Sequence, residues 1–301
     1  MAHDETPAAV LESLVRELGG APDHVEALPG GAVNLTHRVR LTTGDVVVRI
    51  PRDPLDADVF PVETWATTAA ARSGIAVAPV LRSGRRGGLP YLVSEYVEPD
   101  PRPVVDPWHR LGRAARAVGV VPLDGAPPSL YSRFGADLPT SWRAHVEYNV
   151  RSLAGDDPLL QAGAYTSAST LRDVLGPLGT TAFDHGLAHG DLAPRNLLSR
   201  GPDRAPVLLD WGAAEAGPTP WTDARRVFAW ATLDGAVTDT ELAAFLAAAG
   251  IDSASDRRVL AAMTALHLLD VARWARDRRP DRYASSTERC RRGLVALGLS
   301  D

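Results

Sequence analysis

The most informative part of this chain is the stretch His189-Gly190-Asp191-Leu192-Ala193-Pro194-Arg195-Asn196, followed by Val207-Leu208-Leu209-Asp210-Trp211-Gly212. It contains an acid (Asp191), an amide five positions later (Asn196) and a second acid (Asp210) that ends an apolar run. We expect one loop to present Asp191 and Asn196, and the end of a β-hairpin to present Asp210. The stretch therefore predicts an ordered set of polar side chains at one site.

Transfer of a phosphoryl group to a hydroxyl needs such a set. A carboxylate must receive or orient the hydroxyl proton, and an amide and a carboxylate must hold Mg²⁺ on the phosphates. The order and spacing match the kinase pattern H-x-D-x-x-x-x-N followed by D-x-G. We therefore predict that Asp191 is catalytic and that Asn196 and Asp210 are Mg²⁺ ligands, since this cation prefers oxygen donors.

The two segments also resemble a known family. H-G-D-L-x-P-x-N-L-L followed by L-D-W-G is similar to the aminoglycoside phosphotransferase family of small-molecule kinases. Gly190 stands where protein kinases have Arg, and Trp211 stands where they have Phe. The resemblance covers nearly the whole chain. It implies an α+β, bilobal protein-kinase-like fold, with a small N-terminal β-sheet lobe and a larger helical C-terminal lobe.

The pattern of apolar residues agrees with two lobes, predicted at residues 1–97 and 98–301. Strands are expected at 24–28, 36–41, 46–50 and 90–97, and helices at 6–18 and 62–73 in the first lobe. The proline-rich residues 98–103 mark the lobe boundary. Beyond them, helices are expected at 108–118, 141–153, 169–178, 222–233, 239–249, 255–276 and 285–297.

The first hairpin carries a candidate phosphate loop with Gly30, Gly31 and Asn34. Glycine lets backbone N–H groups approach phosphate oxygens closely. A Gly-Gly pair in a hairpin can also be an ordinary turn, so both interpretations stay open here. By resemblance, the backbone from Glu95 to Val97 would meet the purine edge of the nucleotide, which leaves the choice between ATP and GTP open.

The chain has no lysine, so any cation that holds phosphate must be arginine. Strand alternation places Arg49 on the same face as Val47, and an inward charge needs a partner. The kinase-like pairing makes Glu63, in the first turn of the next helix, that partner. The alternative is a solvent-facing Arg49 with Glu63 as an ordinary first-turn acid.

Three further residues near the motif have competing interpretations. The resemblance implies that His189 braces the loop through backbone hydrogen bonds. Arg195 lies between the acid and the amide, where it can stabilise charge on the transferring phosphoryl group or pair on the surface with Asp223 or Glu215. Asp223 begins a helix, where capping is a sufficient role, although the family often has a supporting Asp in this region.

Composition excludes several classes of protein. The 301 residues have a net charge of −5 and no basic stripe, which argues against nucleic-acid binding. The single Cys290 excludes an intrachain disulfide framework and a cysteine-based metal site. No apolar run approaches a membrane span, and no secretory signal is evident. We expect a cytoplasmic monomer or homodimer that does not bind membranes.

The acceptor site implied by the resemblance lies in the helical half, where Arg and acidic residues nearly balance. A polycationic aminoglycoside would need a local acidic patch. Tryptophan side chains can instead line a pocket for a less charged ligand. The members of the candidate patch are Glu147, Asp156, Asp157, Asp270 and Asp277.

Three functions follow from these features. The first is an ATP- or GTP-dependent O-phosphotransferase that uses Mg²⁺ and modifies a small hydroxylated natural product, such as an antibiotic. The second is a metabolic kinase for a sugar, amino alcohol or nucleoside. The third is a nucleotide-binding pseudokinase that acts as a scaffold, which the intact Asp191, Asn196 and Asp210 argue against.

Overall fold

The computed structural model describes residues 6–29, 34–53, 58–251 and 253–300, which form two compact units. The first unit comprises Met1–Val105, Leu123–Pro127 and Arg195–Ala214. The second comprises Asp106–Pro122, Pro128–Pro194 and Glu215–Asp301. The first unit therefore includes the segment with Asn196 and Asp210, whereas Asp191 belongs to the second.

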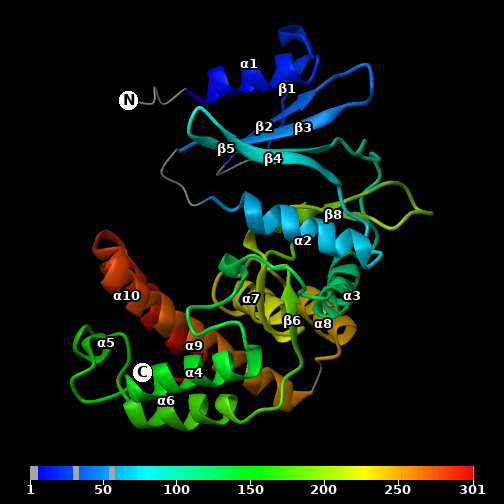
Figure 1. The fold of residues 1–301 in the computed structure, drawn as a ribbon. Coiled ribbons are helices and arrows are strands. Elements are labelled where there is room, and N and C mark those ends of the chain that lie inside the picture. Colours follow the sequence, from blue (N-terminus) through cyan, green and yellow to red (C-terminus); the bar gives the residue numbers. More distant parts are fainter. Residues whose placement is uncertain (1–5, 30–33, 54–57, 252, 301) are drawn as a thin grey trace. The chain divides into compact units, whose positions relative to one another are not determined.

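The first unit is built on a five-stranded antiparallel sheet in the order β1-β2-β3-β5-β4 (Figure 1). Its strands are β1 (Val25–Ala27), β2 (Asn34–Val39), β3 (Val46–Pro51), β4 (Val80–Arg86) and β5 (Leu89–Glu95). In the central strand β3, Val46, Val48 and Ile50 alternate into the core. Arg49 therefore points to the other face, opposite Thr36 of β2 and Leu92 of β5.

Two helices accompany this sheet. Helix α1 (Pro7–Glu17) begins after Thr6, whose side chain accepts a hydrogen bond from the amide of Ala9, and its apolar residues join the sheet core. Helix α2 (Phe60–Arg72) presents Glu63 in its first turn. The unit also contains the two-stranded hairpin of β7 (Leu197–Leu198) and β8 (Val207–Leu208) and the 3₁₀ helix η5 (Trp211–Ala213).

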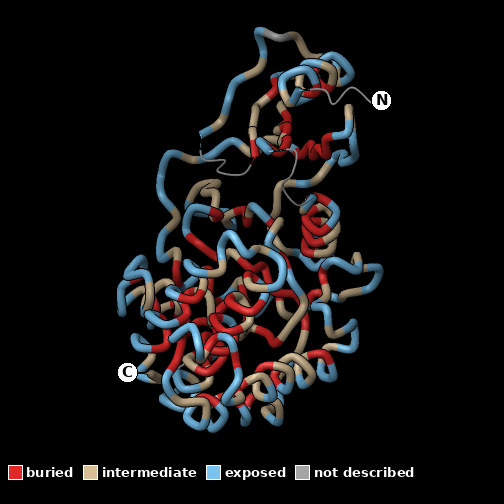
Figure 2. The backbone as a smooth tube through the Cα atoms, turned by 90° about the vertical axis from the view of Figure 1, so that its left-hand side faces the viewer, coloured by how far each residue is buried: buried red, intermediate tan, exposed pale blue. Residues whose placement is uncertain are grey.

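The second unit is mainly helical, and its buried residues form a core among α4, α6, α9 and α10 (Figure 2). Its helices are α3 (Pro107–Gly119), α4 (Leu138–Arg151), α5 (Pro158–Gln161), α6 (Ala168–Leu175), α7 (Trp221–Thr232), α8 (Asp239–Ala249), α9 (Ala254–Arg278) and α10 (Pro280–Ala296). A two-stranded sheet joins β6 (His185–Ala188) to β9 (Glu215–Pro218). Strand β6 ends directly before His189, so this small sheet positions the loop that carries Asp191.

The fold class expected from the sequence is confirmed: the architecture is α+β, with a small antiparallel sheet unit and a helical unit. Strand β4 is a difference, since its mostly exposed residues lack the apolar alternation that predicts strands. Helix α10 begins at Pro280, five residues before the predicted start. The lobe boundary at residue 97 stays a prediction, and no helix among the described residues is long and apolar enough to span a membrane.

Candidate active site

Arg49 is the centre of a charged cluster in the first unit. Its Nη1 donates to Oε1 of Glu63, and its Nη2 lies 3.3 Å from Oδ1 of Asp210. The expected ion pair between Arg49 and Glu63 is therefore present. The contact with Asp210 was not expected, and it joins the strand cation to the second acid of the motif.

The carboxylate of Glu63 is deeply buried in this cluster. The side chain of Glu63 is only 6% exposed, and its Oε2 atom is buried without a hydrogen-bond partner. Burial raises the pKa of Glu63 and so does the charge of Asp210, whereas the guanidinium of Arg49 opposes the shift. Arg49 is the cation that compensates this carboxylate, so the pair fixes where the guanidinium lies.

Local backbone geometry brings the end of the hairpin to Glu63. Asp210 adopts a left-handed conformation (φ 63°) and leads into η5, which packs on α2. A Cβ atom at Gly212 would lie 3.2 Å from Cγ2 of Val59 and 3.5 Å from Oε2 of Glu63. Glycine at this position therefore allows the backbone after Asp210 to approach the start of α2 closely.

Asn196 and Asp210 lie at the same end of the β7–β8 hairpin. The amide of Leu209 donates to the carbonyl of Asn196 at 2.9 Å. Asn196 directly precedes β7, and Asp210 directly follows Leu209 at the end of β8, so the two candidate ligands lie close together in the backbone. The Asp210 side chain is 50% exposed, which leaves carboxylate oxygen accessible. An amide and a carboxylate fit Mg²⁺, which takes one or two protein oxygens and completes its shell with phosphate and water.

No group of three or more His, Cys, Asp or Glu side chains suited to a metal occurs in the part of the chain that the structure describes. This is compatible with Mg²⁺ held on a nucleotide, because the phosphates themselves supply ligands. The assignment of Asn196 and Asp210 as metal ligands stays a prediction.

At the predicted purine edge, the backbone of β5 is partly used by the sheet. The amide of Glu95 donates to Pro79, and the amide of Tyr96 donates to Asp45. Within the described residues, the amide of Val97 has no hydrogen-bond partner, so it is the donor in this segment that remains available to a base. The roles of Glu95 and Val97 in nucleotide binding stay predictions.

In the second unit, Asp223 of α7 holds the loop that carries Asp191. Its two carboxylate oxygens accept the amides of His189 at 3.1 Å and Gly190 at 2.8 Å. The amide of Asp191 donates to Nδ1 of His189 at 3.2 Å. Asp223 is thus a positioning residue rather than only a helix cap, and His189 braces the loop as expected from the family resemblance.

Burial raises the pKa of Asp223 to about 7, although both amide hydrogen bonds favour the charged form. Arg226, one turn further along α7, donates to the carbonyl of Gly190. Sequence reasoning missed Arg226, because nothing in its local pattern shows which side of α7 meets the loop. The loop is therefore held from α7 by an acid and by a guanidinium.

The remaining predicted residues are placed as follows. Gly30 and Gly31 lie outside the described residues. Asn34 is buried at the start of β2. Arg195 is exposed in a 3₁₀ turn directly before Asn196, and its role stays a prediction.

Comparison with known proteins identifies the family of this chain. Residues 24–266 match the model of the phosphotransferase enzyme family. The chain belongs to this family. The family resemblance expected from the sequence, and the enzyme class of small-molecule kinase, are thereby confirmed. No curated protein sequence is similar enough to this phosphotransferase to match it.

Solved structures show the same fold at low sequence identity. The aminoglycoside phosphotransferase APH(4)-Ia is 18% identical with a TM-score of 0.65, and the match covers 97% of this chain and 99% of that one. A GDP and kanamycin complex of another aminoglycoside phosphotransferase is 17% identical, covering 95% and 99%, with a TM-score of 0.60. A spectinomycin phosphotransferase in complex with ADP and spectinomycin is 13% identical, covering 96% and 98%, with a TM-score of 0.54.

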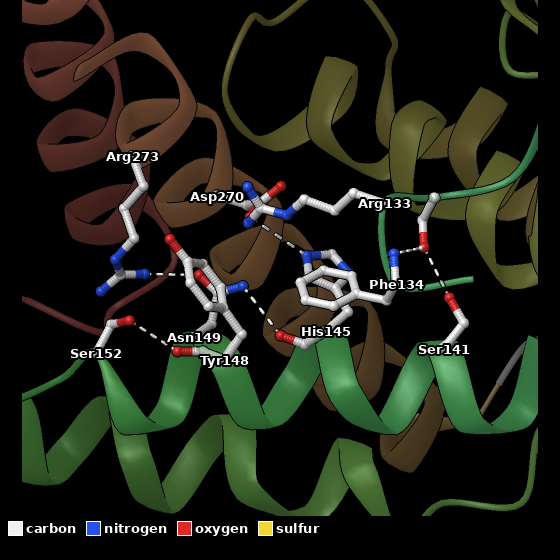
Figure 3. A network of polar contacts seen from close by, with 10 residues as sticks. Arg133, Phe134, Ser141, His145, Tyr148, Asn149, Ser152, Asp270 and Arg273 are labelled. Atoms are coloured by element: carbon white, nitrogen blue, oxygen red, sulfur yellow. Dashed lines mark hydrogen bonds and ion pairs between the residues drawn. The ribbon is translucent and has the colours of Figure 1, made fainter. Parts of the chain in front are cut away.

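The candidate acidic patch in the helical unit of this phosphotransferase is largely neutralised by arginine. Figure 3 shows Asp270 facing Arg133 and His145. Oδ1 of Asp270 lies 3.0 Å from Nη2 of Arg133 and 3.6 Å from Nε2 of His145. Burial opposes ionisation of Asp270, but the neighbouring His145 and the charge of Arg133 hold its pKa below the usual range. The other paired members are Asp157 with Arg273, Asp277 with Arg276 and Glu147 with Arg151.

Proposed function

We propose that this phosphotransferase transfers the γ-phosphate of ATP or GTP to a hydroxyl group of a small natural product. An antibiotic is the first candidate, and its modification would give resistance or self-protection. The new bond joins the acceptor oxygen to the γ-phosphorus, and the bond to the bridging β–γ oxygen breaks. The hydroxyl proton is accepted or oriented by Asp191.

The observation that carries this proposal is the bridge that Arg49 makes between Glu63 and Asp210. A cation tied to a helix glutamate on one side and to a candidate metal ligand on the other suits the phosphates of a nucleotide. Mg²⁺ would be held by Asn196 and Asp210, where it would neutralise charge on the phosphates. The GDP and ADP complexes of the structural neighbours support a nucleotide as the phosphate donor.

In the second unit, the hydrogen bonds that Asp223 accepts and the one that Arg226 donates support the role of Asp191. They fix the two residues that precede Asp191, so its carboxylate needs little reorganisation before reaction. The transition state of phosphoryl transfer is loose, and positioning therefore matters more than the basicity of the acid. The presence of Asp191, Asn196 and Asp210 argues against a scaffold without activity.

The test is phosphate transfer from ATP and GTP with Mg²⁺ to pooled hydroxylated antibiotics and metabolites, with products identified by mass spectrometry. Asp191→Asn is the matched control, since it keeps size and removes the charge. We expect a phosphorylated product that the variant does not form, while nucleotide binding is retained. Equal turnover by Asp191→Asn would remove Asp191 from the mechanism.

A further inference from the structure

A pocket of about 210 Å³ in the second unit lies beside the loop that carries Asp191. It is lined by one face of α7, where Arg225, Ala229 and Leu233 recur at helical spacing. Helices α9 and α10 provide other walls. The neighbouring α7 residue Arg226 lines the pocket and also donates to the carbonyl of Gly190, directly before Asp191. The pocket and the loop therefore share a side chain.

The charged side chains of this pocket favour an anion. Its lining includes three arginines (Arg225, Arg226 and Arg289) and two acids (Glu215 and Asp234). Arg289 and Asp234 neutralise each other, with Nη2 at 3.3 Å from both carboxylate oxygens. Arg225, Arg226 and Glu215 remain, so the rest of the lining carries one excess positive charge.

Arg225 is the residue of this set with capacity for a ligand. Within the described part of the chain, its guanidinium has no hydrogen bond or ion pair. Burial lowers its pKa, and the charge of Glu215 compensates only in part. Desolvation, together with the guanidiniums of Arg225 and Arg226, also lowers the pKa of His267, another lining residue. No nitrogen of this guanidinium is among the fully buried polar atoms of the described residues, so a carboxylate or phosphate in the pocket can reach it and form charge-assisted hydrogen bonds.

We propose that this pocket binds an acidic group of the acceptor at Arg225, so that the enzyme phosphorylates a hydroxylated acid rather than a polycationic aminoglycoside. The inference rests on the proposed function and narrows its acceptor class. Its second support is that most members of the candidate acidic patch in this unit are already paired with arginine. Sites for drug-sized ligands typically have volumes of about 300 Å³ or more. This pocket is smaller, so it suits one acidic group rather than a whole acceptor.

The test compares acceptors in matched charge classes with the full chain, Mg²⁺ and ATP or GTP. The classes are sugar acids, sugar phosphates, neutral sugars and nucleosides, and the polycations kanamycin and hygromycin B. Arg225→Met removes the pocket charge and Arg225→Lys retains it. Glu215→Gln is the matched control, because Glu215 is the lining acid that would serve a cationic acceptor. Thermal unfolding and nucleotide binding of each variant show whether it is folded.

We expect the acids to have the lowest KM, and Arg225→Met to raise that KM about tenfold to a hundredfold with little change in kcat. Arg225→Lys should lie between, and Glu215→Gln should leave the KM unchanged or lower it. A preference of the sugar acids over the phosphates, or the reverse, identifies the anion. Preferred transfer to polycations, with Glu215→Gln impaired and Arg225→Met unaffected, would overturn this inference and leave the proposed function intact. No transfer to any class would refute the proposed function and the inference with it.

Discussion

Replacing Arg49 by methionine tests the charged cluster of the first unit. The substitution leaves Glu63 buried without its cation, and loss of one partner of a buried pair typically costs about 3–5 kcal/mol. We expect the lower end, about 3 kcal/mol, because the Arg49 side chain is 16% exposed and the Asp210 end of the cluster is open to water. At about 2–4 °C per kcal/mol, the midpoint of thermal unfolding should fall by about 6–12 °C.

The loss of stability in Arg49→Met should increase as the pH rises. Glu63 already has a pKa above its ordinary value of 4.5, and removing Arg49 raises it further. A carboxyl group with a higher pKa in the folded state binds more protons when folded, so stability falls as pH rises above 4.5. The difference between Arg49→Met and the wild type should therefore be larger at pH 8 than at pH 5.

The assay is urea and thermal unfolding of the wild type, Arg49→Met and Arg49→Met/Glu63→Gln at both pH values. The double variant should recover most of the loss, since replacing both partners of a buried pair is often nearly neutral. Arg40→Met is the control, because its ion pair with Glu26 is more than half exposed on both sides. Wild-type stability of Arg49→Met at pH 8, or no recovery in the double variant, would refute this account of the cluster.

Three other predictions concern the second unit. Asp223→Ala should lower kcat at least tenfold and destabilise the protein by about 2 kcal/mol, because the amides of His189 and Gly190 lose their acceptors. Activity and unfolding assays check this prediction, and a normal kcat would exclude the positioning role. Since burial raises the pKa of Asp223 from 3.8 to about 7, its contribution to stability declines as pH rises through that interval, and Asp223→Asn should lose this part of the pH profile. Gly112→Ala should lower the free energy of unfolding, measured in urea, by about 1–3 kcal/mol, because the new Cβ would lie 2.2 Å from the carbonyl oxygen of Phe245. Gly155→Ala is the control: its Cβ would meet no atom within 4 Å, so its stability should not change.

The cluster around Arg49 shows what sequence patterns can predict. Alternation along β3, a first-turn acid in α2 and the kinase-like pairing together predict the ion pair with Glu63, and the structure contains it in place of the alternative of a solvent-facing Arg49. The contact between Arg49 and Asp210 spans 161 residues and depends on the left-handed conformation of Asp210, which no local pattern reveals. Long-range contacts of this kind arise from packing, so only the structure could identify them.

The helical unit shows what sequence patterns could not predict. Asp223 is at a helix start, where capping explains an acid locally, yet its oxygens bind the amides of His189 and Gly190. The near balance of charges in this half left a local acidic patch open, but most of its members pair with arginine, and the partners of Asp157 and Asp270 lie more than a hundred residues away in the sequence. A sequence shows which charges are present. Their partners depend on how the helices pack.

The central claim is that the γ-phosphate reaches a hydroxyl of a small acceptor through Asp191. The most direct measurement follows ATP and GTP labelled at the γ-phosphorus during incubation with the enzyme, Mg²⁺ and the hydroxylated acceptor pool. We predict that the label appears in a phosphate ester of a small molecule with the wild type and not with Asp191→Asn. Label that stays in the nucleotide or is released only as inorganic phosphate, despite nucleotide binding, would contradict the account.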